Sequence, residues 1–130
     1  MSILKPISEN KANEKVKKVF EEIKLSRNFD VVPNFWRTIA NNPETLERTW
    51  SSLQEVMKEG SLNALFKEMI YIAVSMTNNC EYCIRSHTKS ARIKGMNDEM
   101  LNELIAVVAM ANETNILVES YQVEVDENLK

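Results

Sequence analysis

The chain has 130 residues, 44% of them hydrophobic and 27% charged, which is the composition of an ordinary soluble domain. This length suffices for one hydrophobic core and is short for two, so we predict a single domain over residues 1–130. The net charge of −3 and the pI near 5.3 give no reason to expect a nucleic acid or an anionic membrane as a partner.

Residues 1–9 are expected to be a lead-in, and helical periodicity begins after them. A first amphipathic helix presents the apolar residues Ala12, Val16, Val19, Phe20 and Ile23. Residues 25–32 have no clear period and are expected to connect. Pro33 suits the first turn of a short helix, and Pro43 suits the start of a longer one whose C-terminal cap is expected at Gly60. The longer helix presents Leu46, Trp50, Leu53 and Met57 on one side.

In the second half of the chain, Ser61 is the expected N-cap of a strongly apolar helix. Its apolar positions are Leu62, Leu65, Phe66, Met69, Ile72, Ala73 and Met76. A turn at Asn78 and Asn79 precedes another helix that ends at Gly95. Asn97 then opens the last helix, whose end within residues 116–125 the pattern leaves open.

The sequence shows no hairpin turn, no internal repeat and no Gly-rich phosphate loop. We therefore predict an all-α domain of about six helices, in which the two helices on either side of Asn79 form a central antiparallel pair. The apolar faces are wide for so small a chain, which leaves room for a subunit interface.

Both cysteines and the only histidine lie in one short stretch. Cys83 follows Cys80 by three residues, His87 follows Cys83 by four, and Glu68 precedes Cys80 by twelve. If the helix begins at Cys80, the two thiols and the imidazole share one face. A helix N-terminus stabilises a thiolate, and a neighbouring imidazole can accept the thiol proton. These residue types at this spacing predict a thiol redox centre.

Glu68 can join this centre only if the chain reverses. Along one straight helix it would lie roughly 18 Å from Cys80, whereas a reversal near Asn79 brings Glu68 and His87 to within roughly 4–5 Å of the same depth in the hairpin. There the carboxylate could orient the imidazole, and partial burial is expected to raise the pKa of Glu68. From the pattern alone, a carboxylate that reaches water is the favoured alternative.

No uninterrupted apolar run approaches the roughly 18 residues of a membrane span, and the first residues lack the pattern of a secretory signal. We therefore predict a cytoplasmic protein. In that reducing compartment a Cys-x-x-Cys pair is more often catalytic or metal-binding than a structural disulfide. Phe35, Trp36 and Tyr82 are possible walls of a substrate pocket, but such residues more often belong to the core.

Several other uses of the cysteine pair are less favoured. Haem attachment needs a histidine directly after Cys83, where Ile84 stands, and thioredoxin-like chemistry needs a preceding strand. A zinc site made of Cys80, Cys83, His87 and Glu68 has permitted ligand types. However, structural zinc usually draws on two separated ligand pairs, so this stays a minority hypothesis and we expect no metal or other cofactor. A pair of merely buried cysteines is weaker still.

The pattern Glu68-x11-Cys80-x2-Cys83-x3-His87 resembles that of the alkylhydroperoxidase D (AhpD)-like group of the carboxymuconolactone decarboxylase superfamily. The segment from Val32-Pro33-Asn34-Phe35 through Pro43-Glu44-Thr45-Leu46 is also like the family's opening segment. The resemblance thus covers about residues 30–115.

This resemblance implies an all-helical homo-oligomer that reduces organic hydroperoxides, or exchanges disulfides, with a dithiol as electron donor. Cys83 matches the peroxidatic thiol that becomes a sulfenic acid, and Cys80 matches the proton donor that then closes the disulfide. His87 and Glu68 match the proton relay. These roles agree with the chemistry expected of the residues themselves.

One position departs from the family's pattern. Better-studied peroxidase members resemble Cys-x-His-Cys, whereas this chain has Tyr82 before Cys83, which puts the rate of peroxide turnover in doubt more than the redox role. The superfamily's decarboxylases work without the cysteine pair, so lactone decarboxylation is not expected. Besides a peroxidase, three hypotheses stay open: a disulfide reductase, a metal-binding module, and a non-catalytic redox sensor or scaffold.

Overall fold

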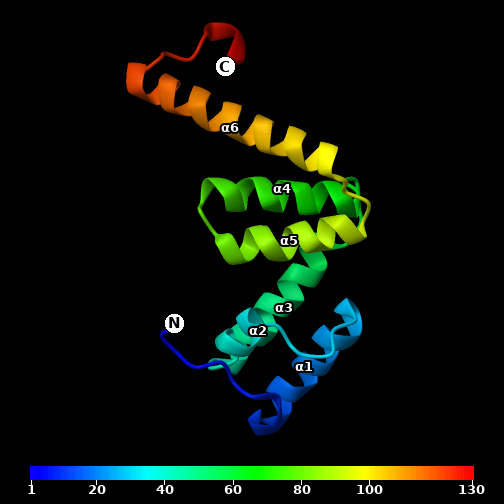
Figure 1. Cartoon of the computed structure of the whole chain (residues 1–130). Coiled ribbons are helices and arrows are strands. Elements are labelled where there is room, and N and C mark those ends of the chain that lie inside the picture. The colour runs from blue at the N-terminus through cyan, green and yellow to red at the C-terminus, as the bar shows by residue number, and fades with distance from the viewer. The chain divides into compact units, whose positions relative to one another are not determined.

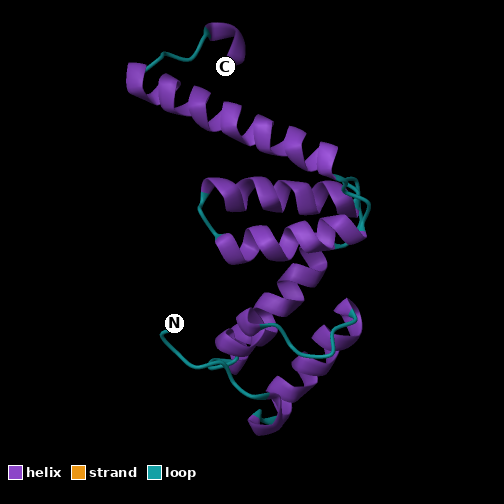
Figure 2. Cartoon of the chain, in the orientation of Figure 1, coloured by secondary structure: helices purple, strands orange, loops and turns teal.

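The computed structural model describes all 130 residues and contains six α-helices, two short 3-10 helices and no strand (Figures 1 and 2). The predicted all-α class is therefore confirmed. The elements are η1 (Glu9–Lys11), α1 (Glu14–Arg27), α2 (Asn34–Ile39), α3 (Pro43–Met57), α4 (Ala64–Thr77), α5 (Glu81–Ile93), α6 (Asp98–Tyr121) and η2 (Glu127–Leu129). They form two compact units, Met1–Lys58 and Glu59–Lys130.

The unit Met1–Lys58 is built on α1. The side chain of Asn13 caps this helix by accepting the N–H of Val16, and Asn28 ends it in the left-handed conformation. The predicted apolar stripe is buried, and with residues from α2, α3 and the connections it forms one continuous core of Ala12, Val16, Val19, Phe20, Ile23, Val32, Trp36, Ala40, Leu46 and Trp50. The predicted connection begins too early, because α1 continues to Arg27 with Leu25 facing solvent.

The prolines and Gly60 show how far local signals reach. Pro43 opens α3, as expected, and Asn42 caps that helix by accepting the N–H of Thr45. Pro33 is the N-cap of α2, one position before its first turn. The cap predicted at Gly60 is wrong: α3 ends at Met57, where its apolar stripe runs out, and Lys58 takes an extended conformation. The N–H of Gly60 instead donates to the carbonyl of Leu62.

The unit Glu59–Lys130 is built on an antiparallel pair, α4 and α5, with α6 packed against α4 (Figure 1). Asn63, and not the predicted Ser61, caps α4 by accepting the N–H of Phe66; asparagine is an equally good cap, and the later start leaves Leu62 outside the helix. Asn79 reverses the chain with φ 55°. The central helix pair predicted from the sequence is confirmed.

The core of this second unit is small. Its fully buried apolar residues are Ile72, Ala91 and Met96, surrounded by the partly buried Leu65, Met69, Met76, Met100, Leu101 and Leu104. Helix α6 begins at the predicted Asn97 cap and continues to Tyr121, and none of its residues is fully buried. Its exposed apolar side chains include Ile105, Val107, Met110, Ile116, Leu117, Val118 and Tyr121.

Helix α6 also bears on the expectation that no segment could span a membrane. Its 24 residues are long and apolar enough to cross a bilayer by length and composition alone. The uninterrupted apolar stretch within it, residues 104–111, stops at Asn112, which is why a search for one continuous run does not find it. One such helix is weak evidence for a membrane location.

Candidate active site

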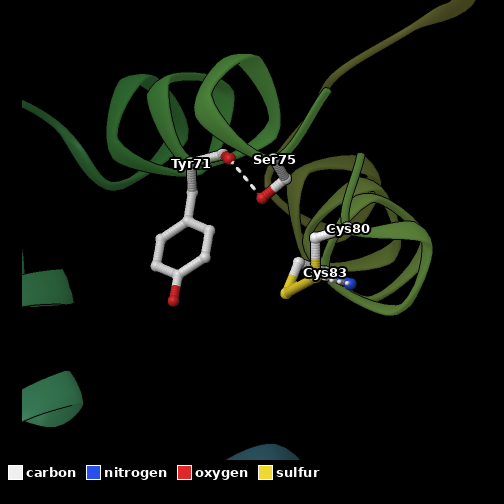
Figure 3. The surroundings of a disulfide bond; sticks show 4 residues. All are labelled: Tyr71, Ser75, Cys80 and Cys83. Atoms are coloured by element: carbon white, nitrogen blue, oxygen red, sulfur yellow. Dashed lines mark hydrogen bonds between the residues drawn. A yellow bond between two sulfur atoms is a disulfide. The ribbon is translucent and has the colours of Figure 1, made fainter. Parts of the chain in front are cut away.

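The two cysteines stand at the start of α5, as the spacing predicted. Cys80 is the N-cap of the helix, and its Sγ accepts the N–H of Cys83 at 3.4 Å. The two residues are joined by a disulfide across a Cα–Cα distance of 5.3 Å, and both are partly exposed (Figure 3). An amide directed at Sγ of Cys80 is positioned to stabilise a thiolate there once the disulfide is reduced.

Helix α4 supplies the support beneath the disulfide. The N–H of Cys80 donates to the carbonyl of Ser75 at 2.9 Å, and the buried hydroxyl of Ser75 donates to the carbonyl of Tyr71 at 2.7 Å. In Figure 3, the Tyr71 ring and the disulfide extend from the same side of the hairpin. The Tyr71 ring also stacks on the imidazole of His87, with centroids 3.6 Å apart and an interplanar angle of 21°. The last turns of α4 therefore position both Cys80 and His87.

Glu68 and His87 meet across the hairpin. Nδ1 of His87 lies 2.6 Å from Oε2 of Glu68, and the two residues are 8% and 2% exposed, respectively. The proximity expected from a reversal near Asn79 is confirmed. The alternative that Glu68 reaches water, which the pattern alone favoured, is wrong, because packing of α4 against α5 covers the carboxylate.

Lys94 is the second partner of this carboxylate. It follows the last residue of α5, and its Nζ donates to Oε1 of Glu68 at 3.1 Å. Burial of Glu68 favours the neutral acid, but hydrogen bonds from His87 and Lys94, together with their positive charges, outweigh it. The pKa of Glu68 therefore lies below its ordinary value. The raised pKa expected from burial is wrong, because that expectation contained no cationic donors.

The ionised carboxylate decides which way the imidazole is protonated. A carboxylate only accepts hydrogen bonds, so Nδ1 of His87 carries the hydrogen that points at Glu68. In the neutral imidazole, Nε2 then holds the lone pair and can act as a base. The arrangement is that of an orienting acid, a base and a pair of sulfur atoms on adjoining helical turns.

The remaining predicted residues lie elsewhere. Tyr82 is on the first turn of α5 and is 46% exposed, and Trp36 belongs to the core of Met1–Lys58, where Phe35 and Trp50 pack against it edge-on. The structure contains no group of three or more His, Cys, Asp or Glu side chains that could hold a metal ion, and the two sulfur atoms that zinc would need are bonded to each other.

Three residues of the site were not predicted from the sequence: Tyr71, Ser75 and Lys94. The first two had a usable signal, because Ser75 is a hydroxyl seven residues after Glu68 on an otherwise apolar helix, and that spacing places both on one face. Tyr71 lies between them on the same side. Lys94 had none, since one lysine among several charged residues looks like part of a solvated surface.

Comparison with known proteins agrees with this geometry. The sequence model of the Carboxymuconolactone decarboxylase family matches residues 43–123. The chain belongs to this family. The match starts at Pro43, later than the start of the resemblance near residue 30, and extends beyond its expected end.

A solved structure shares the fold over nearly the whole chain. The crystal structure of the alkylhydroperoxidase AhpD core from Rhodospirillum rubrum ATCC 11170 is 42% identical in sequence and superposes with a TM-score of 0.93, covering 99% of this chain and 97% of that one. The predicted AhpD-like fold is therefore confirmed.

Two curated relatives match shorter segments. "Uncharacterized protein 4 in cox locus" of Paracoccus denitrificans is 37% identical over 54 residues, which is 42% of this chain and 49% of the relative. "Uncharacterized protein YdfG" of Bacillus subtilis (strain 168) is 35% identical over 49 residues, or 38% of this chain and 33% of the relative. The matched segments thus span half or less of these relatives.

Proposed function

We propose that this chain is a thiol-dependent peroxidase that reduces organic hydroperoxides through Cys80 and Cys83, with Glu68 and His87 as a proton relay. The observation that carries the proposal is a disulfide at a helix N-terminus whose own helix holds, one turn further on, an imidazole hydrogen-bonded to a buried carboxylate. A hydroperoxide substrate also agrees with the AhpD core, the alkylhydroperoxidase to which the chain is similar.

The proposed reaction begins from the reduced pair. Nε2 of His87 takes the proton of the Cys83 thiol, and the resulting thiolate attacks the terminal oxygen of the hydroperoxide. The O–O bond breaks, Cys83 becomes a sulfenic acid, and the departing alkoxide takes the proton of Cys80 to leave as an alcohol. The thiolate of Cys80 then attacks the sulfenic acid on Cys83 and expels hydroxide, which is protonated to water by the imidazolium of His87. The two thiols lose two electrons and the peroxide gains them. A dithiol donor restores the pair by thiol–disulfide exchange.

Lactone decarboxylation, the reaction in the family's name, makes no use of this arrangement. It needs neither a second thiol nor a disulfide, whereas here Ser75, Cys83 and the turn before α5 all hold Cys80 in place. A disulfide reductase without peroxidase activity is the second candidate. Tyr82 favours this second candidate. Its exposed phenol occupies the position at which the Cys-x-His-Cys-like motif of the better-studied peroxidases has a second imidazole.

The decisive experiment follows hydroperoxide loss with a dithiol donor. Adding one equivalent of tert-butyl hydroperoxide to the reduced chain should remove both thiols, and dithiothreitol should restore them. Cys83→Ser should abolish turnover while keeping the helical circular dichroism of the wild type. Thiols that persist after hydroperoxide, in a chain that still reduces a model disulfide, would leave only the second candidate.

We also propose that the chain forms a homo-oligomer and that it works in the cytoplasm, a reducing compartment in which dithiol donors are maintained. A second copy of the chain is the partner that best fits the exposed stripe of Phe66, Ile70 and Val74 on α4 and the exposed side chains of α6. A lipid partner is disfavoured, because every 18-residue window of α6 contains Glu113 and at least one further carboxylate, and carboxylates are costly inside a bilayer.

Sedimentation tests this assembly. The molecular mass of the wild type from sedimentation should exceed the 15.0 kDa of one chain, and Ile70→Asp should lower that mass. Leu25→Asp, a matched change at an exposed position of α1, should not. A wild-type chain that sediments as a monomer would contradict the assembly but leave the redox proposal untouched.

A further inference from the structure

Lys94 occupies a fixed position at the end of α5. Its N–H donates to the carbonyls of Ser90 and Ala91, and the chain then turns through Gly95 at φ 106°, so that the N–H of Met96 returns to the carbonyl of Ala91 at 2.9 Å. A closed helix end of this kind holds the Lys94 backbone in place. Its side chain, 34% exposed, reaches the buried carboxylate from the solvent side.

We propose that Lys94 is a positioning residue of the redox site, which holds the Glu68 carboxylate ionised with Oε2 turned to His87 and thereby keeps Nε2 of that imidazole available as the base. The inference deepens the proposed function and rests on it. The two carboxylate oxygens have separate donors: Nζ of Lys94 lies 3.1 Å from Oε1, and Nδ1 of His87 lies 2.6 Å from Oε2.

The need for a second donor follows from the burial of Glu68. An ionised carboxylate removed from water is costly unless hydrogen bonds and a positive charge compensate it. Without the ammonium group, the negative charge of Glu68 would be balanced by an added proton. A proton on Glu68 would weaken the carboxylate as an acceptor of the hydrogen bond from Nδ1. A proton on His87 would occupy Nε2. Lys94 supplies a positive charge and an N–H donor without a proton being added to Glu68 or His87.

Among the groups around Glu68, Lys94 is the one that can compensate the negative charge of the carboxylate. From α5, His87 and Lys94 face the carboxylate, and from its own helix Tyr71 covers the imidazole. From α6, Met100, Leu101 and Leu104 pack against the core of Ile72, Ala91 and Met96, and none of the three titrates. Lys94 is thus the cation that compensates the charge of Glu68 while His87 is neutral.

The test uses three variants and a spectroscopic signal that reports on one residue. His87 is the only histidine in the chain, so its two ring nitrogens can be followed by ¹⁵N NMR without mutation of other sites. Lys94→Met removes the charge, Lys94→Arg retains it, and Arg85→Met removes a cation from an exposed pair with Glu81 on the same helix. Circular dichroism checks that each variant folds.

In the reduced wild type at mildly alkaline pH, the spectrum should show the hydrogen on Nδ1. Lys94→Met should reduce that tautomer in favour of hydrogen on Nε2, and it should move the acidic limb of thiol alkylation by iodoacetamide to higher pH, with a rate about 10-fold lower on that limb. This is part of the roughly 10²–10⁴-fold that a positioned base typically contributes. Lys94→Arg should restore both readouts, and Arg85→Met should change neither.

An unchanged tautomer and alkylation profile in Lys94→Met would overturn the inference. So would equal effects of Lys94→Met and Arg85→Met, which would show that the effect does not depend on the contact between Lys94 and Glu68. Both readouts are independent of peroxide turnover. A chain that shows the expected changes but does not consume hydroperoxide would therefore contradict the proposed peroxidase and support the role of Lys94.

Discussion

The two units of this chain use their interiors differently. The core of Met1–Lys58 consists of apolar side chains alone, including Phe20, Ile23 and Leu46. In Glu59–Lys130 the buried apolar residues are few, and Glu68, Ser75 and His87 are buried among them. Apolar packing tolerates many arrangements, whereas buried polar groups require one set of partners. The difference indicates that the first interior serves stability and the second serves orientation.

Two carboxylates make the same contrast on a smaller scale. The pKa of Glu9 is lowered chiefly by a hydrogen bond from the backbone N–H of Val32, with further help from Lys24, which outweighs its burial. The pKa of Glu68 is lowered by side chains, one of which is a base. Glu9 therefore joins segments of the fold, while Glu68 sets the protonation of a neighbour.

The largest effect should come from the apolar core. Ile23→Ala removes a side chain that is 0% exposed and should lower the free energy of unfolding by about 2–5 kcal/mol. Leu25→Ala removes an aliphatic side chain of the same size, 82% exposed on the same helix, and should cost less than about 0.5 kcal/mol. Urea unfolding measures both. Equal losses in the two variants would contradict the assignment of this face of α1 to the core.

Glu68→Gln should have the next largest effect, because the amide retains the size of the side chain but not the charge that His87 and Lys94 bind. We expect the free energy of unfolding to fall by about 1–3 kcal/mol at neutral pH. Since folding lowers the pKa of Glu68, its contribution is fully present above the ordinary glutamate pKa of about 4.3 and is lost as the pH falls through the lower folded value.

Urea unfolding of wild type and Glu68→Gln at neutral pH and at about pH 3 measures this linkage. The difference in free energy of unfolding between wild type and Glu68→Gln should be smaller at the lower pH. Glu81→Gln, at a position 79% exposed on α5, is the control, and its free energy of unfolding should stay close to that of the wild type at both pH values. A gap that widens on acidification would have the wrong sign for a carboxylate that folding stabilises in its charged form.

The two glycines allow a smaller, matched comparison. Gly95 has φ 106° in the turn that follows Lys94, so Gly95→Ala should destabilise the chain by roughly 1–2 kcal/mol through backbone strain. Gly60 has no positive φ, and an added Cβ would meet only Lys67 Nζ at 3.9 Å, so Gly60→Ala should be nearly neutral. Thermal unfolding midpoints distinguish the two. Similar shifts would show that the turn at Gly95 carries no special constraint.

The smallest expected effect concerns Glu9. Glu9→Gln weakens the bonds to Val32 and Lys24 and should cost about 0.5–1.5 kcal/mol at neutral pH. This contribution should likewise disappear on acidification, because the folded pKa of Glu9 is lowered. Thiol alkylation should be unaffected, because the Glu9 carboxylate bonds to Val32 and Lys24 and not to His87. Glu22→Gln, exposed on α1, is the control for stability.

Much of the fold could be predicted from local patterns. The apolar period identified the helices, Pro43 and Asn97 marked two starts, and Asn79 marked the reversal. The errors at Gly60 and Ser61 arose because several residues there could end or begin a helix, and only packing selected among them. The cysteines and His87 were placed by spacing within one helix, which needs no knowledge of the tertiary structure.

By itself, the sequence determined that two sulfur atoms and an imidazole share the first turns of one helix, because positions along a helix are set by its period. Only the tertiary structure decided the state of Glu68. Its burial depends on how α4 packs against α5, and its charge depends on Lys94, a residue 26 positions away along the chain. Burial and charge compensation oppose each other at this carboxylate. Their balance depends on the atoms that surround it, which no local pattern contains.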